Sequence, residues 1–459
     1  MPRDRSSPHL TPTPARDPPR TLRRVLYRTI VGVARRLLPL AGRFSDKLDR
    51  GVAGRRGAVE RMVDWATSQR DARRPLIWLH APSVGEALMA QAIAGALRAE
   101  RPDTQIVFTH FSPSAERVRD QVGADIADYL PWDHPEDLAP VLDAVHPTVI
   151  VFVRTEIWPE LMRQAAMRGA PSLLVNGVIG EDSGRLSTAG RWILGAAYRE
   201  LAAIGVVGEE DRALFSRLGV DPSRVIVTGD ARIDQVLARL ETMQTARSAG
   251  LGLLGTERSA FTVVAGSTWP EDEEHLIPAV AEARTLDPIR LVIAPHEPTA
   301  HEIERLSRRL RAAGLRPRLL SGIEQGAPVQ SEATVRVHSE AALPEVLILD
   351  RLGVLADAYA AGHAAYVGGG FGDDGLHSVV EPAALGVPVI FGSRHGNTRE
   401  AGGLRDAGGG IEVHDRDELC FAITGLARAP EAAGTIGAVA RRFVEERRGG
   451  ARRNAGLIA

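Results

Sequence analysis

Short apolar segments alternate with helical segments through most of the chain, in two series that a polar connection separates. The first series starts at Pro75, and the second follows Ser259. Apolar strands joined by helices form parallel sheets that helices cover on both faces. We therefore predict an α/β protein with two Rossmann-like doubly wound domains that face a cleft.

Six apolar segments in each series are rich in β-branched residues and are predicted as strands. The first six are RPLIWLHA, TQIVFTHF, TVIVFVRT, PSLLVNGV, LAAIGVVG and RVIVTGD, and the second six are FTVVAGST, IRLVIAPH, PEVLILD, AAYVGGG, VPVIFG and GGIEVH. Two such domains bind ligands at the carboxyl ends of their sheets. The predicted parts are a disordered tail (1–20), a helical segment (21–59), a first domain (60–235), a linker (236–258), a second domain (259–425) and a helical tail (426–459) that could cross back to the first domain.

The bulk composition excludes several classes of protein. A length of 459 residues suggests two or three domains, and 44% hydrophobic residues are enough for full cores. The net charge of −2 argues against a nucleic-acid partner for the whole chain. A single cysteine, Cys420, excludes a disulfide within the chain and fits a reducing compartment.

The N-terminal region predicts contact with a membrane surface. After a proline- and arginine-rich start, residues 21–42 place Arg24, Arg28 and Arg35 opposite an apolar stripe. The stripe consists of Leu22, Val25, Leu26, Ile30, Val33, Leu37 and Leu40. Since a spanning helix needs roughly 20 apolar residues in a row, the arginines favour a helix that lies on an anionic bilayer. The alternative is a surface helix packed on the protein.

The stretch GGGFGDDGLHSVVEPAALGVPVIFG combines a glycine loop with a short helix and a strand. A helix N-terminus after such a loop suits an anion, most often a nucleotide phosphate. The amides from Gly375 to Ser378 would face the phosphate, and Glu381 would accept hydrogen bonds from ribose. Alternatively, Ser378 and Glu381 form a capping box. Asp373 and Asp374 are more typical of a turn than of a metal site.

The segment SVGE follows the first strong strand. Glu86 at that strand's carboxyl end could accept a proton from an attacking hydroxyl, and Gly85 would leave room for a ligand. The alternative is again a capping box between Ser83 and Glu86, in which the helix N-terminus stabilises the ionised carboxylate and weakens it as a base.

Two further strand ends carry polar groups in the second domain. Ser267 and Thr268 precede Trp269-Pro270 at the start of a helix, and they could cap that helix or also touch a donor. His296 ends another predicted strand, and it could either face the cleft or lie in a solvated loop. The 13 histidines form no zinc-binding spacing.

Taken in order, the motifs resemble one family. They are WLHAPSVGE, FSPSAERV, TEIWPEL, VNG, GEEDRALFSRLGV, VTGDARID, AGST and GLHSVVEPAALGVPVIFG. This set resembles the 3-deoxy-D-manno-octulosonic acid (Kdo) transferases of lipopolysaccharide synthesis over most of residues 24–415. The resemblance implies a GT-B glycosyltransferase that moves Kdo from CMP-Kdo to a lipid A precursor with inversion, without a metal or another cofactor.

The resemblance also implies roles for individual residues. Glu86 would be the catalytic base, with His80, Ser83 and Glu156 on the acceptor side. The implied donor-binding residues are Arg232, Ser267, Thr268, His296, Gly375, His377, Ser378 and Glu381. An arginine common in the family before the histidine is missing here, so His296, Arg232 or Arg394 would balance the donor phosphate. The implied location is the cytoplasmic face of the bacterial inner membrane, with peripheral or monotopic attachment.

Three other functions remain open from the sequence. They are a UDP-N-acetylglucosamine 2-epimerase on the same scaffold, a different lipid-linked transferase such as lipid A disaccharide synthase, and a surface-binding protein that has kept the fold without catalysis.

Overall fold

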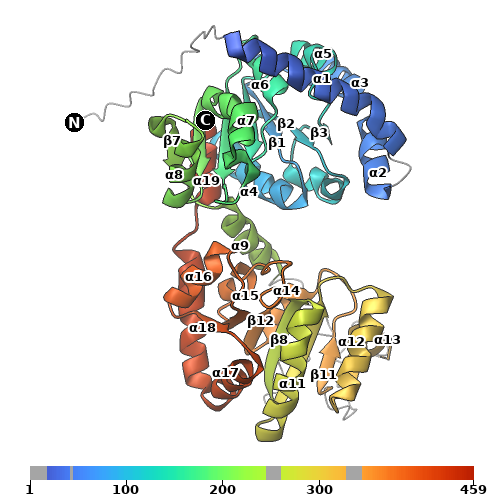
Figure 1. The fold of residues 1–459 in the computed structure, drawn as a ribbon, viewed down its shortest axis with the longest axis vertical. Helices are drawn as coiled ribbons and strands as arrows, with labels where there is room; N and C mark the ends of the chain where they lie inside the picture. The colour runs from blue at the N-terminus through green and yellow to red at the C-terminus, as the bar shows by residue number, and fades with distance from the viewer. Residues whose placement is uncertain (1–17, 42–44, 244–259, 327–343) are drawn as a thin grey trace, which may run out of the picture. The chain divides into compact units, whose positions relative to one another are not determined.

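The computed structural model describes residues 18–41, 45–243, 260–326 and 344–459. The chain divides into two compact units, unit 1 (Met1–Gln235 with Arg448–Ala459) and unit 2 (Val236–Arg447) (Figure 1). The predicted tail falls mostly outside the described residues, as do residues 244–258 of the predicted linker.

Unit 1 is built on a seven-stranded sheet in the order β3-β2-β1-β4-β5-β6-β7, and its strand pairs are parallel. The strands are β1 (Leu76–His80), β2 (Gln105–His110), β3 (Ile126–Tyr129), β4 (Val149–Val153), β5 (Ser172–Gly177), β6 (Ala203–Val206) and β7 (Val225–Val227). The helices are α1 (Pro18–Ala41), α2 (Asp46–Arg55), α3 (Ala58–Gln69), α4 (Val84–Glu100), α5 (Pro135–Val145), α6 (Pro159–Ala166), α7 (Thr188–Glu200), α8 (Glu209–Arg217), α9 (Ala231–Met243) and α19 (Gly450–Ile458). The later turns of α9 belong to unit 2.

Unit 2 holds a second parallel sheet of seven strands, in the order β10-β11-β9-β8-β12-β13-β14. The strands are β8 (Phe261–Thr268), β9 (Ile289–Pro295), β10 (Pro317–Leu319), β11 (Val346–Ile348), β12 (Ala364–Val367), β13 (Val389–Gly392) and β14 (Gly410–Val413). The helices are α11 (Pro270–Leu286), α12 (Ala300–Ala312), α13 (Leu320–Gly326), α14 (Leu355–Ala361), α15 (Val380–Ala384), α16 (Arg399–Asp406), α17 (Arg416–Arg428) and α18 (Pro430–Glu445).

The predicted α/β class with two parallel sheets is confirmed, and the strand alternation explains it. Along β1, Leu76 and Trp78 enter one apolar cluster, while Ile77 and Leu79 enter another on the opposite face. Both faces are therefore buried, as expected for a parallel sheet under helices. The sequence missed β3 and β10, because each is a short strand at the edge of its sheet and carries few apolar residues.

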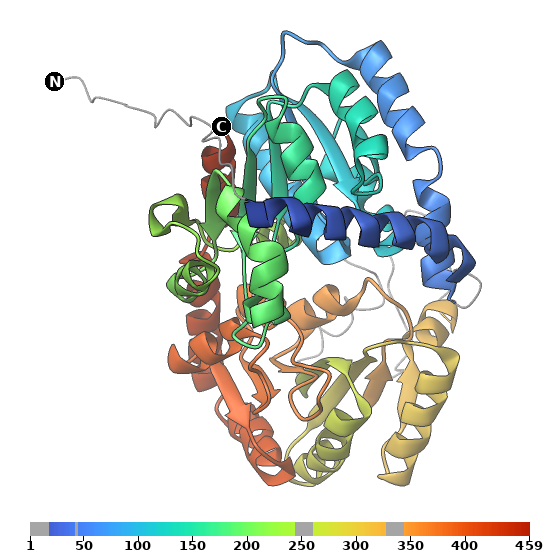
Figure 2. The same cartoon turned by 45° about the horizontal axis from the view of Figure 1, so that its top comes forward.

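The last helix of the chain is an integral part of unit 1. Helix α19 packs on α4 and beside β5 and β6, and Figure 2 shows this dark red helix among the blue and green elements. Asp234 of α9 accepts hydrogen bonds from the amides of Gly449 (2.7 Å) and Ala451 (2.8 Å), which caps the start of α19. Asn454 is fully buried, and its Oδ1 accepts from the Asn176 amide at 3.0 Å.

We predict that Asn454→Ala lowers the free energy of unfolding of unit 1 by about 1–3 kcal/mol, because the buried Asn176 amide loses its side-chain acceptor. Urea unfolding followed by tryptophan fluorescence measures the change. The matched control on the same helix is Arg452→Ala, which removes an exposed ion pair to Glu100 and should have little effect. Equal stability of the two variants would contradict this role of α19.

Candidate functional site

In each unit some of the candidate residues lie where the strand order reverses. In unit 1 this point lies between the neighbouring strands β1 and β4, because β1 is followed along the chain by β2 on its other side. Glu86 follows β1, and Glu156 follows β4. Ligands of open α/β sheets bind at such switch points, outside the carboxyl ends of the strands.

Glu86 is half-buried in the first turn of α4. The Ser83 hydroxyl donates a hydrogen bond to the Glu86 carboxylate, and the Ser83 side chain accepts no capping bond from an amide. The two side chains therefore do not form a regular capping box. The neighbouring Gly85 is exposed, and a Cβ there would meet no residue other than its chain neighbours and its own helix within 4 Å.

His80 is fully buried at the end of β1, and both ring nitrogens have partners. The Trp158 indole Nε1 donates to His80 Nε2 at 3.0 Å, and His80 Nδ1 lies 3.0 Å from the Thr109 hydroxyl oxygen. Since Nε2 accepts, the ring proton is on Nδ1. We conclude that His80 positions Trp158 and, in this structure, is too deeply buried for direct contact with an acceptor.

Glu156 lies beside this histidine, with one third of its side chain exposed. Its Oε1 is 3.9 Å from His80 Nε2, and this oxygen is buried without a hydrogen-bond partner. A buried carboxylate oxygen with unused acceptor capacity is a feature of ligand sites. The acceptor-side role of Glu156 remains a prediction.

In unit 2 the strand order reverses between β8 and β12, and the glycine loop that follows β12 packs against the end of β8. Ser267 adopts a φ of 55°, and a Cβ on Gly368 would lie 2.3 Å from its carbonyl oxygen. Only glycine permits this approach. Thr268 is buried, with its hydroxyl toward Glu273 and Ala294. The predicted contact between Thr268 and the donor is therefore wrong, because the side chain lies in the protein interior.

Three rings form a column at this edge of unit 2. Trp269 stacks on His296 with centroids 4.3 Å apart, and His296 lies 4.6 Å from His377. Burial, followed by the neighbouring His296, lowers the pKa of His377 to about 4. His377 is therefore a neutral hydrogen-bonding group at pH 7 and does not replace the missing arginine.

Sequence reasoning missed two side chains that fix the glycine loop. Asp272 is buried at the start of α11 and accepts from the amides of Trp269 (2.9 Å) and Gly369 (2.7 Å). The Asn397 amide exchanges hydrogen bonds with both backbone groups of Leu376. The available signal for Asp272 was its place as the third residue of the helix that begins at Pro270, where a carboxylate can accept from the N-cap amide.

The short helix after the loop differs from the prediction. Helix α15 has five residues and begins after Val379, so Ser378 and Glu381 form no capping box. The Glu381 carboxylate pairs instead with Arg239 Nη1 at 3.0 Å. Because one turn has a small dipole, an anion bound here would depend on individual loop amides. The Leu376 amide already donates to Asn397 Oδ1 and the His377 amide to the Gly368 carbonyl, both at 3.0 Å, so two of the four amides predicted to face a phosphate are used inside the protein.

Asp373 is almost fully exposed and pairs with Arg394. Arg394 also donates its backbone amide to the Gly370 carbonyl at 2.9 Å, which places this cation beside the glycine loop. Among the described residues, no group of three or more histidine, cysteine, aspartate or glutamate side chains could hold a metal ion. Arg232, the other arginine predicted to bind the donor, lies in unit 1 in the first turn of α9.

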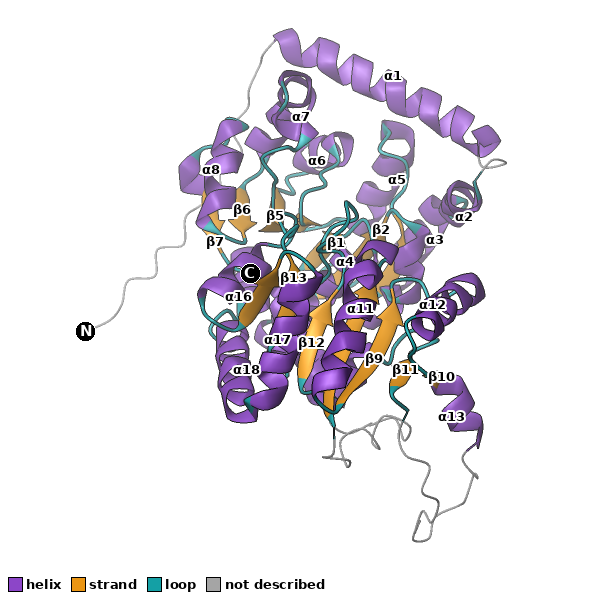
Figure 3. Cartoon of the chain, turned by 60° about the horizontal axis from the view of Figure 1, so that its bottom comes forward, coloured by secondary structure: helices purple, strands orange, loops and turns teal. Residues whose placement is uncertain are grey.

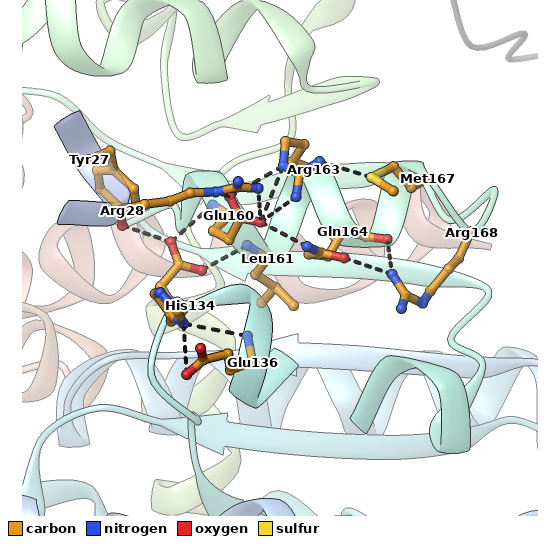
Figure 4. Close-up of polar contacts among 11 residues, drawn as sticks. Tyr27, Arg28, His134, Glu136, Glu160, Leu161, Arg163, Gln164, Met167 and Arg168 are labelled. Carbon is orange, nitrogen blue, oxygen red and sulfur yellow. Dashed lines mark hydrogen bonds and ion pairs between the residues drawn. The ribbon is translucent and has the colours of Figure 1, made fainter. Parts of the chain in front are cut away.

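Helix α1 forms a second surface of unit 1, outside α5, α6 and α7 (Figure 3). Its polar side faces the protein. The Tyr27 hydroxyl donates to the buried Asp133 at 2.7 Å, and the Arg28 guanidinium makes two bonds, of 3.0 and 2.9 Å, to Glu160 (Figure 4). Burial raises the pKa of Asp133 to about 6, whereas Arg163 and Arg28 outweigh burial and lower the pKa of Glu160.

The apolar side of α1 faces away from the protein. Its exposed side chains, between 44% and 67% accessible, are Leu22, Val25, Leu26, Ile30, Val33 and Leu37. Arg28 and Arg35 pair with protein carboxylates, which corrects their predicted use toward lipid, whereas Arg24 and Arg36 are exposed. No helix within the described ranges has the length and apolar character needed to cross a membrane.

Comparison with solved structures places the two-unit fold in the GT-B class. The chain is similar to a glycosyltransferase from Rickettsia africae (TM-score 0.54, 11% identity, 84% of this chain and 97% of that one). It is also similar to the UDP-GlcNAc 2-epimerase of Neisseria meningitidis (TM-score 0.59, 13% identity, 84% and 98%). At these identities the likeness shows the fold alone.

Residues 53–235 match the family described as 3-deoxy-D-manno-octulosonic-acid transferase (kdotransferase). Curated 3-deoxy-D-manno-octulosonic acid transferases are similar over much of the chain, including those of Chlamydophila psittaci (28% identity, 69% of each chain) and Haemophilus influenzae (24% identity, 83% of this chain and 86% of that one). These matches confirm the predicted resemblance of the chain to the Kdo transferases.

We predict that His377 stays neutral down to about pH 5, since its lowered pKa means that the folded protein disfavours the charged ring. The same shift lowers stability as pH falls from the ordinary histidine value near 6.5 towards 4. NMR titration of the ¹³Cε1-labelled histidines, with His377→Gln for assignment, measures the pKa. Exposed His414, whose pKa is raised by Glu418, is the internal control. A His377 midpoint at or above 6.5 would contradict the prediction.

Proposed function

We propose that the protein transfers Kdo from CMP-Kdo to a lipid A precursor and inverts the anomeric configuration. The observation that carries the proposal is Glu86, a half-buried carboxylate that follows β1 at the switch point of unit 1. The family match over residues 53–235 includes this residue.

In the proposed reaction, a hydroxyl oxygen of the lipid attacks the anomeric carbon of Kdo while Glu86 takes the hydroxyl proton. The bond between the anomeric carbon and the phosphate oxygen breaks, and CMP leaves with the electron pair. A single displacement of this kind inverts the anomeric centre. The hydrogen bond from Ser83 holds the carboxylate in one orientation, which favours proton transfer at a fixed position.

Unit 2 supplies the proposed donor site. Asp272 and Asn397 hold the glycine loop through the amides of Gly369 and Leu376, so the shape of the loop is set before CMP-Kdo binds, and loop amides that are not used inside the protein can face the phosphate. Fixed donors stabilise the negative charge that develops on the leaving phosphate without reorganisation. His296, Ser267 and the neutral His377 lie at the same edge of the sheet. We propose that Arg394 balances the negative charge of the donor phosphate, since its amide and its side chain both contact the loop.

We further propose that helix α1 attaches the protein to the anionic cytoplasmic surface of the inner membrane. Its polar side is occupied by protein carboxylates, so its apolar side is left for another apolar phase. A bilayer interface fits a row of exposed apolar side chains with arginines at its margin, and a lipid acceptor resides in such a bilayer.

We expect Glu86→Gln to fold normally, to keep CMP-Kdo binding and to lose at least about 100-fold in transfer rate, because glutamine cannot accept the proton. The assay is release of CMP that depends on a tetraacyl lipid A precursor. Glu100→Gln, the same substitution at the far end of α4, is the control and should retain activity. Activity of Glu86→Gln within a few-fold of wild type would reject the base.

The same assay separates the rival functions. Conversion of UDP-N-acetylglucosamine without lipid would indicate an epimerase. Turnover with another lipid-linked acceptor, but none with CMP-Kdo, would indicate a different transferase. Binding without turnover would indicate a non-catalytic protein.

We expect Ile30→Glu to weaken binding to phosphatidylglycerol-containing vesicles by about tenfold or more, because it puts a charge into the apolar face of α1. Sedimentation with the vesicles measures the bound fraction. The matched control is Phe421→Glu in unit 2, where the side chain is also highly exposed. Equal losses in the two variants, or none in Ile30→Glu, would count against attachment through α1.

A further inference from the structure

Two guanidinium groups in unit 1 share one buried carboxylate, that of Asp230. Arg154 directly follows β4, and Asp230 and Arg232 lie at the start of α9. Arg232 Nη2 is 3.3 Å from Asp230 Oδ2, and Arg154 Nη1 is 4.0 Å from the same oxygen. Both separations exceed the roughly 2.8 Å of a strong charge-assisted bond, so neither pairing with this oxygen is tight.

Asp230 has little freedom to move closer to either cation. Its Oδ1 accepts from Asn176 Nδ2 at 3.1 Å and from the Arg232 amide at 2.8 Å. Asn176 is itself fixed, since its Oδ1 accepts from the Ala231 amide at 2.6 Å and its own amide donates to Asn454. Oδ1 of the carboxylate is thus held by neutral groups, while Oδ2 faces both guanidinium groups.

Arg154 carries two signs of an incomplete site. Its φ is 83°, a left-handed conformation that arginine rarely adopts. Its Nη1 is buried without a hydrogen-bond partner, although the side chain as a whole is 26% exposed. A strained residue with an unsatisfied buried donor is expected where a ligand completes the interactions.

We propose that Arg154 and Arg232 form an anion-binding site for the acidic group of a substrate, either the carboxylate of the donor sugar or a phosphate on the lipid acceptor. The inference rests on the proposed function, which supplies both anions, and it assigns Arg154 a role that the motifs did not reveal. Arg154 is two residues before Glu156 in the loop after β4, and β4 pairs with β1, which leads to Glu86. An anion held here would fix a substrate close to both carboxylates.

The decisive variant is Arg154→Gly. Glycine adopts a φ of 83° without strain, so the loop keeps its shape and the midpoint of urea denaturation should not fall. We expect the KM for the substrate that carries the anion to rise by about tenfold to a hundredfold, with a smaller change in kcat. Arg154→Lys should recover part of the loss. Arg73→Ala, at a highly exposed arginine of unit 1, is the control.

Two arms distinguish the sources of the anion. A higher KM for CMP-Kdo alone, with weaker calorimetric binding of free Kdo and unchanged binding of CMP, identifies the sugar carboxylate. A higher KM of Arg154→Gly for the phosphorylated lipid alone identifies the acceptor phosphate, provided that the variant and wild type have the same KM for a dephosphorylated lipid.

If Arg154→Gly leaves both KM values unchanged and binds free Kdo and inorganic phosphate as wild type does, the anion site is overturned. Failure of the proposed function has a different signature, because wild type itself would then release no CMP in the presence of lipid. In that case the binding of free Kdo and phosphate to wild type and Arg154→Gly still tests the site.

Discussion

Parallel strands bring all of their carboxyl ends to one edge of a sheet, and both units of this protein depend on that constraint. In unit 1 it brings the loops after β1 and β4 together, and with them Glu86 and Glu156. In unit 2 it sets the end of β8 against the glycine loop after β12. The side chains come from distant parts of the sequence, and the sheet order alone makes them neighbours.

Rigidity in these sites comes from buried polar groups. Asp272 ties the glycine loop to α11, His80 holds Trp158, and Asn176 with Asn454 fixes the surroundings of Asp230. Each of these groups is buried and has hydrogen-bond partners, so it orders the backbone around it without facing a substrate. By contrast, Arg154 and Glu156 each keep a buried atom without a partner beside the switch point of unit 1, and this is why we propose that they bind substrate.

The sequence was sufficient for the parts of the fold that periodicity encodes. Long strands such as β1 and β8 are apolar on both faces and were predicted, whereas β3 and β10 are short edge strands with a weak pattern. Glu86 was found from its position after a strand. Arg154 was missed because its φ and its partner Asp230, far along the chain, are properties of the folded loop. The direction of α1 was also beyond the sequence, since a helix with one apolar face can turn either face to the protein.

The orientation of α1 has an energetic consequence. Its polar side satisfies Asp133 and Glu160, which are almost fully buried and would be costly without their partners. Six apolar side chains remain about half exposed, and moving them into a bilayer would yield roughly 6 kcal/mol at about 1 kcal/mol each. That is comparable with a single acyl anchor, which binds membranes only marginally, so stable attachment needs a second contribution. Exposed Arg24 and Arg36 can supply it at an anionic surface, at about 1 kcal/mol each. Attachment of this strength would be reversible and sensitive to lipid charge, which distinguishes it from a helix that spans the bilayer.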